Sequence, residues 1–256
     1  MPVLVEPWIG EAPPAPFAGW RLHELDETDS TNAQAARLGP WEAVVARVQT
    51  AGRGRHARRW ISDAGGLWLS AVVPTPGPAG RWSLLPLAAG CALCETLQEL
   101  GVMEPRLRWP NDVLIGRAKL AGILVERFTG ATAVLGLGLN LANRPEAVDP
   151  ALAGTVVRLA DLLQPLPAPA VVCALLLDRL RATQELLAAG RGGHLAARLR
   201  PFWRPHRVRV TLRPSRAEID GEFAGVDAEG RLGMRTVPDS IRWLEAAEVE
   251  MLREIF

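Results

Sequence analysis

The chain is almost without lysine. Lys and Arg together number 29 among 256 residues, and Lys119 is the only lysine, so the other 28 are arginine. The ammonium of Lys is a compact charge on a flexible stem, whereas the guanidinium of Arg is a wide planar fork. One lysine in an arginine background indicates either a site too narrow for the fork or a remnant of biased composition. The residues around Lys119 must decide between these interpretations.

Other scarce features exclude whole classes of protein. The net charge is only +1, which argues against a bulk affinity for nucleic acid or membrane. No apolar run is long enough to span a bilayer, and the start of the chain lacks the basic segment of a secretory signal. Three cysteines fit a reducing cytoplasm better than a disulfide framework. Cys91 and Cys94 lie in an apolar helical run without a second ligand pair, which favours buried thiols over a zinc site.

The length suits one large domain with a small appendage. Residues 1–19 are Pro-rich and are predicted to be a loosely attached lead-in. After Pro205 the composition changes to short strands at regular spacing, separated by glycines, which is typical of a small barrel. We therefore predict a large domain over residues 20–204 and a small β domain over residues 205–256.

Periodicity and turn residues predict the elements of both parts. Thr31 and Gln34 match a capping box and predict a short helix that ends at Gly39. Further helices are expected at residues 83–100, with Ser83 as the cap, and at 155–163, 171–190 and 193–203. Strands are expected at residues 44–49, 67–73, 107–109, 113–115, 120–127, 133–141, 208–212, 217–223, 232–236, 240–244 and 249–253.

Residues 50–66 form an arginine-rich segment between two predicted strands, called here the arginine loop. Gly52 and Gly54 alternate with Arg53 and Arg55, so a mobile backbone carries fork-shaped donors that bind phosphate or carboxylate. This pattern suits a loop that closes over a small anionic ligand. A nucleic-acid patch and a plain solvated loop remain alternatives on this segment alone.

Three further segments carry polar groups at the ends of elements. Trp109–Asp112 is either a simple turn or a turn that presents Asn111 and Asp112 to a ligand or Mg²⁺. Lys119 starts a predicted strand, and Gly122 leaves bare backbone beside its ammonium. Asp29–Asn32 either caps the first helix or binds a neutral polar group such as a urea.

Glycines also interrupt the predicted strand that ends at Asn140, in the run Leu135–Asn140. Glycine weakens a strand interior, so its presence there indicates a place where a ligand or another part of the chain comes close.

These segments, in this order and spacing, resemble the biotin protein ligases. The matching motifs are D-S-T-N at 29–32, Q-T-A-G-R-G-R at 49–55, R-W-P-N-D at 108–112, K-L-A-G-I-L-V-E at 119–126 and G-L-G-L-N-L at 136–141. The resemblance covers residues 22–145 strongly and the strand-rich tail more loosely. It implies an α+β fold, with a mixed-sheet catalytic domain of the biotin/lipoate ligase type followed by a small SH3-like β-barrel.

The resemblance implies a cytoplasmic ligase that uses ATP and Mg²⁺ to activate biotin as biotinyl-5′-AMP. The biotinyl group would then pass to a lysine of the biotin carboxyl carrier protein of acetyl-CoA carboxylase or a related carboxylase. The implied catalytic residues are Lys119, Arg53, Arg55 and Asp112. The implied biotin-binding residues are Ser30, Thr31, Asn32, Gln49, Gly52, Arg53, Arg55, Lys119 and Gly122. The implied ATP or adenylate contacts are Arg55, Trp60, Asn111, Asp112, Lys119 and Asn140, with Asp112 also as a magnesium ligand.

The chain differs from the family's motifs at two positions, and one related family is an alternative. Ala57 stands where the family's loop has a glycine, which predicts a stiffer loop, and Ala247 stands where the ending has one. About twenty Pro-rich residues precede the first motif, too few for the DNA-binding domain that some members carry, so neither that domain nor nucleic acid binding is expected. A lipoate or octanoate ligase or transferase of the same superfamily is the nearest alternative, and a homodimer is left open.

Overall fold

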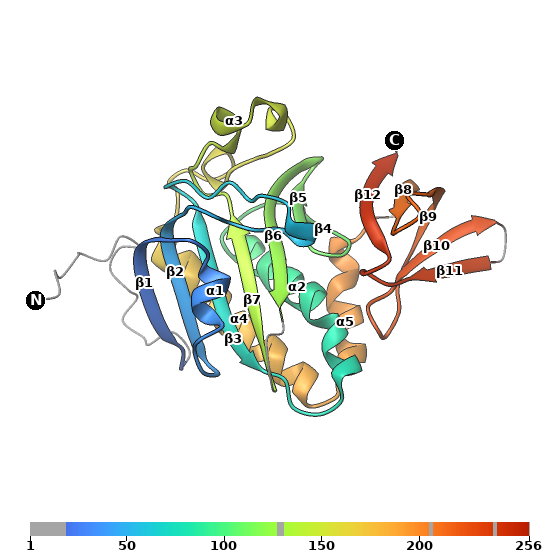
Figure 1. Cartoon of the computed structure of the whole chain (residues 1–256), viewed down its shortest axis with the longest axis horizontal. Helices are drawn as coiled ribbons and strands as arrows, with labels where there is room; N and C mark the ends of the chain where they lie inside the picture. Colours follow the sequence, from blue (N-terminus) through green and yellow to red (C-terminus); the bar gives the residue numbers. More distant parts are fainter. Residues whose placement is uncertain (1–18, 127–130, 205–206, 238–239, 256) are drawn as a thin grey trace, which may run out of the picture.

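The computed structural model describes residues 19–126, 131–204, 207–237 and 240–255, which build two sheets. The larger sheet has seven strands in the order β1-β2-β3-β7-β6-β5-β4 (Figure 1). Only β1 and β2 pair in parallel, so the sheet is mixed, as predicted. Its strands are β1 Arg21–Thr28, β2 Glu42–Gln49, β3 Leu67–Pro74, β4 Pro105–Arg108, β5 Asp112–Ile115, β6 Ala118–Glu126 and β7 Thr132–Leu139.

Strand β1 is the one strand that the sequence pattern did not predict. It lies at the edge of the sheet and pairs only with β2. Most of its side chains are exposed or half-buried, so charged residues are tolerated along it and no apolar alternation marks it.

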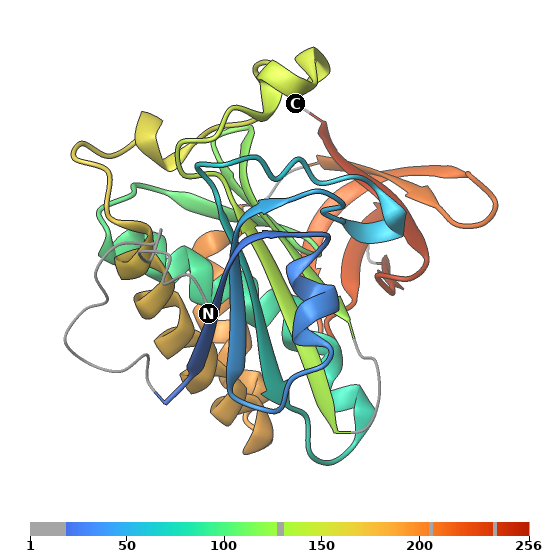
Figure 2. The same cartoon turned by 60° about the vertical axis from the view of Figure 1, so that its left-hand side comes forward.

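The helices lie on both faces of this sheet. The longest, α2 Leu85–Glu99 and α4 Pro169–Ala188, pack together on one face, with α5 Gly192–Leu199 against them. The short helix α1 Thr31–Ala35 lies on the opposite face (Figure 2). A fifth helix, α3 Pro145–Val148, stands above the end of β7 (Figure 1).

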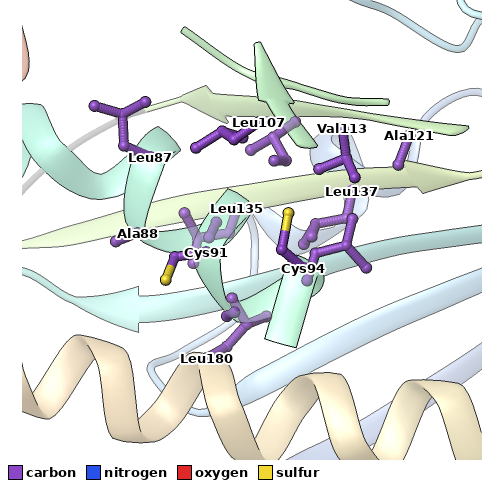
Figure 3. Packing of buried hydrophobic residues seen from close by; sticks show 14 of the residues in the cluster. Leu87, Ala88, Cys91, Cys94, Leu107, Val113, Ala121, Leu135, Leu137 and Leu180 are labelled. Atoms are coloured by element: carbon purple, nitrogen blue, oxygen red, sulfur yellow. The ribbon is translucent and has the colours of Figure 1, made fainter. Parts of the chain in front are cut away.

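The core lies between α2 and the sheet, and Cys91 and Cys94 are part of it. Both thiols lie among leucines from α2 and the strands (Figure 3) and have no exposed surface. The burial of a leucine such as Leu97 contributes about 2 kcal/mol to folding. Burial raises the pKa of the Cys91 thiol to about 12, so it stays protonated. The prediction that these cysteines are buried small apolar residues is confirmed.

The structure corrects three predicted helix features. The Thr31–Gln34 capping box does not form: Ser30 precedes α1, and Gln34 Nε2 instead lies 3.1 Å from Thr28 Oγ1. Ser83 lies inside a 3₁₀ turn and does not cap α2. The helix expected at 155–163 is only a 3₁₀ turn, Leu159–Asp161, because backbone bonds to Lys119 hold residues 155–157 extended beside β6.

The smaller sheet has five antiparallel strands in the order β11-β10-β9-β8-β12, in agreement with the predicted β-rich tail. They are β8 Arg207–Leu212, β9 Glu218–Val226, β10 Leu232–Val237, β11 Ser240–Leu244 and β12 Val249–Ile255. The predicted boundary falls at residues 205–206, and the predicted lead-in falls almost wholly within residues 1–18. Both lie outside the described residues.

Buried polar contacts join the two sheets. Arg106 of β4 forms an ion pair of 2.7 Å with Glu254 of β12, and both side chains are largely buried. Trp109 Nε1 donates to the Gly230 carbonyl at 3.0 Å. These contacts place β12 beside the end of β5, where the candidate site lies.

Candidate active site

A cavity of about 690 Å³ opens where the first half of β6 and the end of β7 meet the arginine loop and β12. Its volume suits a ligand the size of a cofactor. In Figures 1 and 2 the arginine loop runs from β2 over the sheet toward β12. The cavity is lined by all the predicted site residues except Gly52, namely Ser30, Thr31, Asn32, Gln49, Arg53, Arg55, Trp60, Asn111, Asp112, Lys119, Gly122 and Asn140.

Gly52 has a structural role instead. A Cβ at this position would lie 2.4 Å from Ser62 Oγ and 2.5 Å from the Trp60 carbonyl. Glycine therefore lets the two sides of the arginine loop approach, and the Trp60 amide donates to the Gly52 carbonyl at 2.9 Å.

One end of the cavity is lined by neutral polar groups. Gln49 Oε1 accepts from the Thr31 amide at 2.8 Å and from Thr31 Oγ1 at 3.0 Å, while Gln49 Nε2 donates to Ser62 Oγ at 2.9 Å. Thr31 and Asn32 are buried. This end offers fixed donors and acceptors without a net charge, which suits a neutral amide or urea.

Two arginines of the loop bind protein groups. Arg53 Nη2 lies 3.6 Å from Glu126 Oε2. Arg55 Nη2 donates to the carbonyls of Ala246 at 2.6 Å and Val249 at 3.1 Å, so it joins the loop to the smaller sheet. Burial lowers the pKa of the Arg55 guanidinium, although it remains a cation at neutral pH.

The charged centre of the site is a three-residue ion cluster. Asp112 Oδ1 lies 2.7 Å from Lys119 Nζ, and Asp112 Oδ2 lies 2.7 Å from Arg108 Nη2. Burial would raise the pKa of the Asp112 carboxyl, but the two cations and their hydrogen bonds outweigh it and hold that pKa below its ordinary value. Asp112 is therefore ionised, and the cluster keeps one net positive charge facing the cavity.

The glycines of the two central strands lie close to side chains of the same chain, as their pattern predicted. A Cβ at Gly138 would lie 2.4 Å from Trp60 Nε1, and one at Gly122 would lie 3.0 Å from the Trp60 ring. The Trp60 ring therefore lies against the bare backbone of both strands, and its centroid is 4.8 Å from Lys119 Nζ. Trp60 Nε1 is buried and has no hydrogen-bond partner among the described residues.

Two asparagines line the cavity while supporting the backbone. Asn111 Nδ2 donates to the Ile123 carbonyl at 2.7 Å and so holds the turn before β5 against β6. Asn140 Oδ1 accepts from Asn143 Nδ2 at 3.0 Å, which fixes the orientation of its amide. Both amides are therefore rigid before any ligand binds.

Residues outside the predicted set also contribute. Ser70 Oγ lies 2.7 Å from Thr31 Oγ1 and 2.6 Å from Asn32 Oδ1, and Glu126 lies beside Asn32 and Arg53. Arg108 and Glu126 stand inside quoted motifs, so the motifs contain them without revealing their contacts. Ser70 lies in an apolar strand and has no sequence signal beyond being polar there.

Comparison with known proteins agrees with this geometry. A sequence profile of the biotin/lipoate A/B protein ligase family matches residues 26–140. A biotin–[acetyl-CoA-carboxylase] ligase of Mycobacterium tuberculosis is 38% identical over 238 residues, which are 86% of this chain and 87% of that protein. This chain belongs to the biotin protein ligase family.

Two further biotin protein ligases resemble the chain along most of its length. The biotin–[acetyl-CoA-carboxylase] ligase of Paracoccus denitrificans is 35% identical over 243 residues, which are 88% of this chain and 98% of that protein. The structure of a biotin protein ligase from Aquifex aeolicus in complex with biotin and ATP superposes with a TM-score of 0.77 at 24% identity, covering 92% and 99% of the two chains. The latter shows the same fold.

Among the described residues, no helix is long and apolar enough to cross a membrane.

The departure from the biotin protein ligase pattern at Ala57 has a structural cost. Ala57 has a φ of 56°, in the left-handed region that favours glycine. We expect Ala57→Gly to raise the free energy of unfolding by about 0.5 kcal/mol, because relief of ~1–2 kcal/mol of strain exceeds the added freedom of the unfolded chain. Urea unfolding would measure this, with the β-branched Ala57→Val as the opposite control. A glycine variant less stable than the parent would contradict the argument.

Proposed function

We propose that this chain is an ATP-dependent biotin protein ligase. A carboxylate oxygen of biotin attacks the α-phosphorus of ATP, the bond to the β-phosphate oxygen breaks, and biotinyl-5′-AMP and pyrophosphate form. The amine of an acceptor lysine then attacks the acyl carbon, AMP leaves, and an amide bond remains. The Lys119–Asp112–Arg108 cluster, with one net positive charge beside the cavity, carries this proposal.

The charge of the site suits the first step. Two anions, a carboxylate and a phosphate, approach each other, and preorganised cations stabilise the charge that develops between them. Lys119 would lie between the two groups. Arg53 and Arg55 would bind the biotin carboxylate and the adenylate phosphate, for which Arg55 must exchange its carbonyl partners for the phosphate.

We assign the neutral end of the cavity to biotin. Its ureido oxygen and nitrogens would pair with groups from Ser30, Thr31, Asn32 and Gln49. The biotin contact expected at Gly122 stays a prediction, because the Trp60 ring and the Lys119 stem lie against that glycine. The adenylate would extend toward Asn140, with Trp60 covering the strand glycines and excluding water from the reactive anhydride. Asn111 and Asp112 would border the phosphates.

Magnesium is proposed to arrive with ATP, as part of the substrate. Among the described residues no group of three or more His, Cys, Asp or Glu gathers at metal-binding distance. Both Asp112 oxygens already accept hydrogen bonds from cations, so this donor set does not fit a resident ion. The predicted contact of Asp112 with Mg²⁺ therefore concerns only the ion that ATP carries, and no step depends on it.

The acceptor proposed for the second step is the biotin carboxyl carrier protein of acetyl-CoA carboxylase or a related carboxylase. We also propose a cytoplasmic location, which the buried free thiols fit. The division into a catalytic domain over residues 20–204 and a small domain over 205–256 is proposed on the two separate sheets.

Incubation with α-labelled Mg·ATP, biotin and a carrier domain tests the proposal. Labelled biotinyl-5′-AMP should form without the carrier, and AMP and biotinylated carrier should appear when it is added. Parallel reactions with lipoate and octanoate test the superfamily alternative. Activation of lipoate in preference to biotin would overturn the assignment.

The scarcity of lysine predicts that the enzyme does not biotinylate itself. Biotinyl-5′-AMP reacts with exposed amines, and the chain offers only its N-terminal amine and Lys119, which is ion-paired to Asp112 at 2.7 Å. Intact mass after incubation with biotin and Mg·ATP should show negligible adduct. The matched control is Arg37→Lys, which places one ammonium at an exposed position and should gain a biotinyl group. Abundant adducts on the parent chain would refute the prediction.

A further inference from the structure

Glu126 lies at the end of β6, where its carboxylate contacts two separate parts of the site. Asn32 Nδ2, from α1, donates to Glu126 Oε2 at 2.7 Å. Arg53 Nη2, from the arginine loop, lies 3.6 Å from the same oxygen. One anion therefore joins the neutral end of the cavity to the segment that carries its cations.

The first contact fixes the amide of Asn32. Its Nδ2 faces the Glu126 carboxylate, and its Oδ1 lies 2.6 Å from Ser70 Oγ. A Cβ at Gly136 would lie only 2.2 Å from Oδ1, so the amide also lies tightly against β7. A carboxylate can only accept, so it holds the NH₂ group toward itself and prevents the amide from turning over.

The second contact holds Arg53 near the cavity before a ligand arrives. The Arg53 side chain is 44% exposed and would otherwise be free to move in solvent. A carboxylate is also the group of biotin that Arg53 is proposed to bind. Glu126 thus offers Arg53 a carboxylate like that of biotin. Because Arg53 is already ordered by Glu126, biotin binding loses less free energy to the ordering of this side chain.

The two contacts of the loop are independent of each other. Arg55 binds carbonyls of the smaller sheet, whereas Arg53 binds the end of β6. Loss of the Glu126 charge should therefore free residues 50–54 more than residues 55–60, because Arg55 and His56 stay within hydrogen-bond distance of the Val249 carbonyl of β12.

We propose that Glu126 is a positioning residue for biotin, acting through Asn32 and Arg53. This inference rests on the proposed function. Glu126 would orient the Asn32 amide toward the ureido group and would hold the arginine loop in a binding-ready position. It touches neither the α-phosphate nor the attacking carboxylate, so its effect should fall on biotin affinity and not on the chemical step.

Three variants separate the two contacts. Glu126→Gln keeps an acceptor for Asn32 but removes the charge that binds Arg53, and we expect biotin affinity to fall about 5-fold. Ser70→Ala removes a hydrogen-bond partner from Asn32 Oδ1 and from Thr31 Oγ1 but does not touch Arg53, and we expect a fall of about 10-fold. Glu222→Gln is the matched control, because Glu222 faces Arg235 at 3.8 Å on the smaller sheet, away from the cavity.

The measurements are hydrogen–deuterium exchange of the ligand-free protein, biotin affinity by calorimetry, and the adenylation rate at saturating biotin. Only Glu126→Gln should speed exchange in residues 50–54. Both site variants should weaken biotin binding, and all saturated rates should stay within about 2-fold of the parent. Unchanged exchange and affinity in Glu126→Gln would overturn the inference. So would a lower saturated rate with unchanged affinity, since Glu126 would then act on the chemistry.

The experiment distinguishes this inference from the proposed function. A parent enzyme that makes no biotinyl-5′-AMP would refute the function. Hydrogen–deuterium exchange is measured without a ligand. It therefore tests the Glu126–Arg53 contact whether or not the parent enzyme makes biotinyl-5′-AMP.

Discussion

Lys119→Arg should reduce biotin-dependent pyrophosphate release by about 100-fold or more. The loss of one well-placed donor to a developing charge costs about 3 kcal/mol of transition-state stabilisation. The substitution keeps the positive charge, so the loss would come from the shape of the head group. The prediction therefore tests whether the lone lysine is there for its geometry.

The surroundings of Lys119 leave little room for a guanidinium. Its Nζ lies 2.7 Å from Asp112 Oδ1 and 4.8 Å from the centroid of the Trp60 ring. A Cβ at Gly122 would lie only 3.2 Å from Lys119 Cε, so the backbone of β6 already touches the stem. An arginine would displace Trp60 or project into the space proposed for the carboxylate and the α-phosphate.

Steady-state release of pyrophosphate with biotin and Mg·ATP measures the effect. Arg37→Lys exchanges the same two head groups at an exposed position and should keep the parental rate. A parental rate in Lys119→Arg would show that any cation suffices there.

Asp112→Asn should lower both activity and stability. The carboxylate separates two cations, and without its charge Lys119 and Arg108 repel each other and leave their positions. After allowance for partial exposure, we expect a loss of about 2–3 kcal/mol in the free energy of unfolding. The displaced Lys119 should also reduce pyrophosphate release about 100-fold.

Urea unfolding and the pyrophosphate assay measure these losses. Asp26→Asn removes a carboxylate from the exposed pair with Arg47 and should change stability by less than about 0.5 kcal/mol. Equal effects of the two substitutions would refute a special role of Asp112.

The stability term should also depend on pH in a defined direction. The pKa of Asp112 is lower in the folded chain than in the unfolded chain, where it is about 3.9. Its contribution is therefore complete above that value and is lost as the pH falls through the folded pKa. The stability difference between the parent and Asp112→Asn should be constant near neutrality and should shrink below about pH 4. A difference that grew on acidification would contradict the assigned shift.

Regular apolar patterns predicted the interior of the fold well. Strands β3 and β7 and helix α2 are mostly buried, and β6 and α4 each bury several apolar side chains, so apolar residues recur along all five elements. The sequence-based predictions failed where the burial of side chains does not determine the order of apolar and polar residues. Strand β1 is an exposed edge, and residues 155–157 are extended because they bond to the backbone at Lys119, which no local signal reveals.

The ligase motifs predicted which residues line the cavity, but they did not predict the contacts that these residues make with one another. All but one of the predicted residues line one cavity. The reason is that most of the motifs lie at or near the ends of strands that belong to the same sheet. Gly52 does not line it, since its need for glycine arises from contacts with Ser62 and Trp60 across the loop. Ser70 and Glu126 became visible only through partners on other elements.

The sequence by itself determined the family, the mixed-sheet fold, the arginine loop and the solitary Lys119. The family, the arginine loop and Lys119 are read from motifs that are local in the chain, and the mixed-sheet fold is what the resemblance to that family implies. Tertiary structure alone decided that Asp112 lies between two cations, that Arg55 binds the smaller sheet and that Glu126 joins Asn32 to Arg53. The partners of Arg55 and of Glu126 lie more than seventy residues away in the sequence. Contacts between such distant residues leave no pattern in the sequence, because only the packing of the fold brings the partners together.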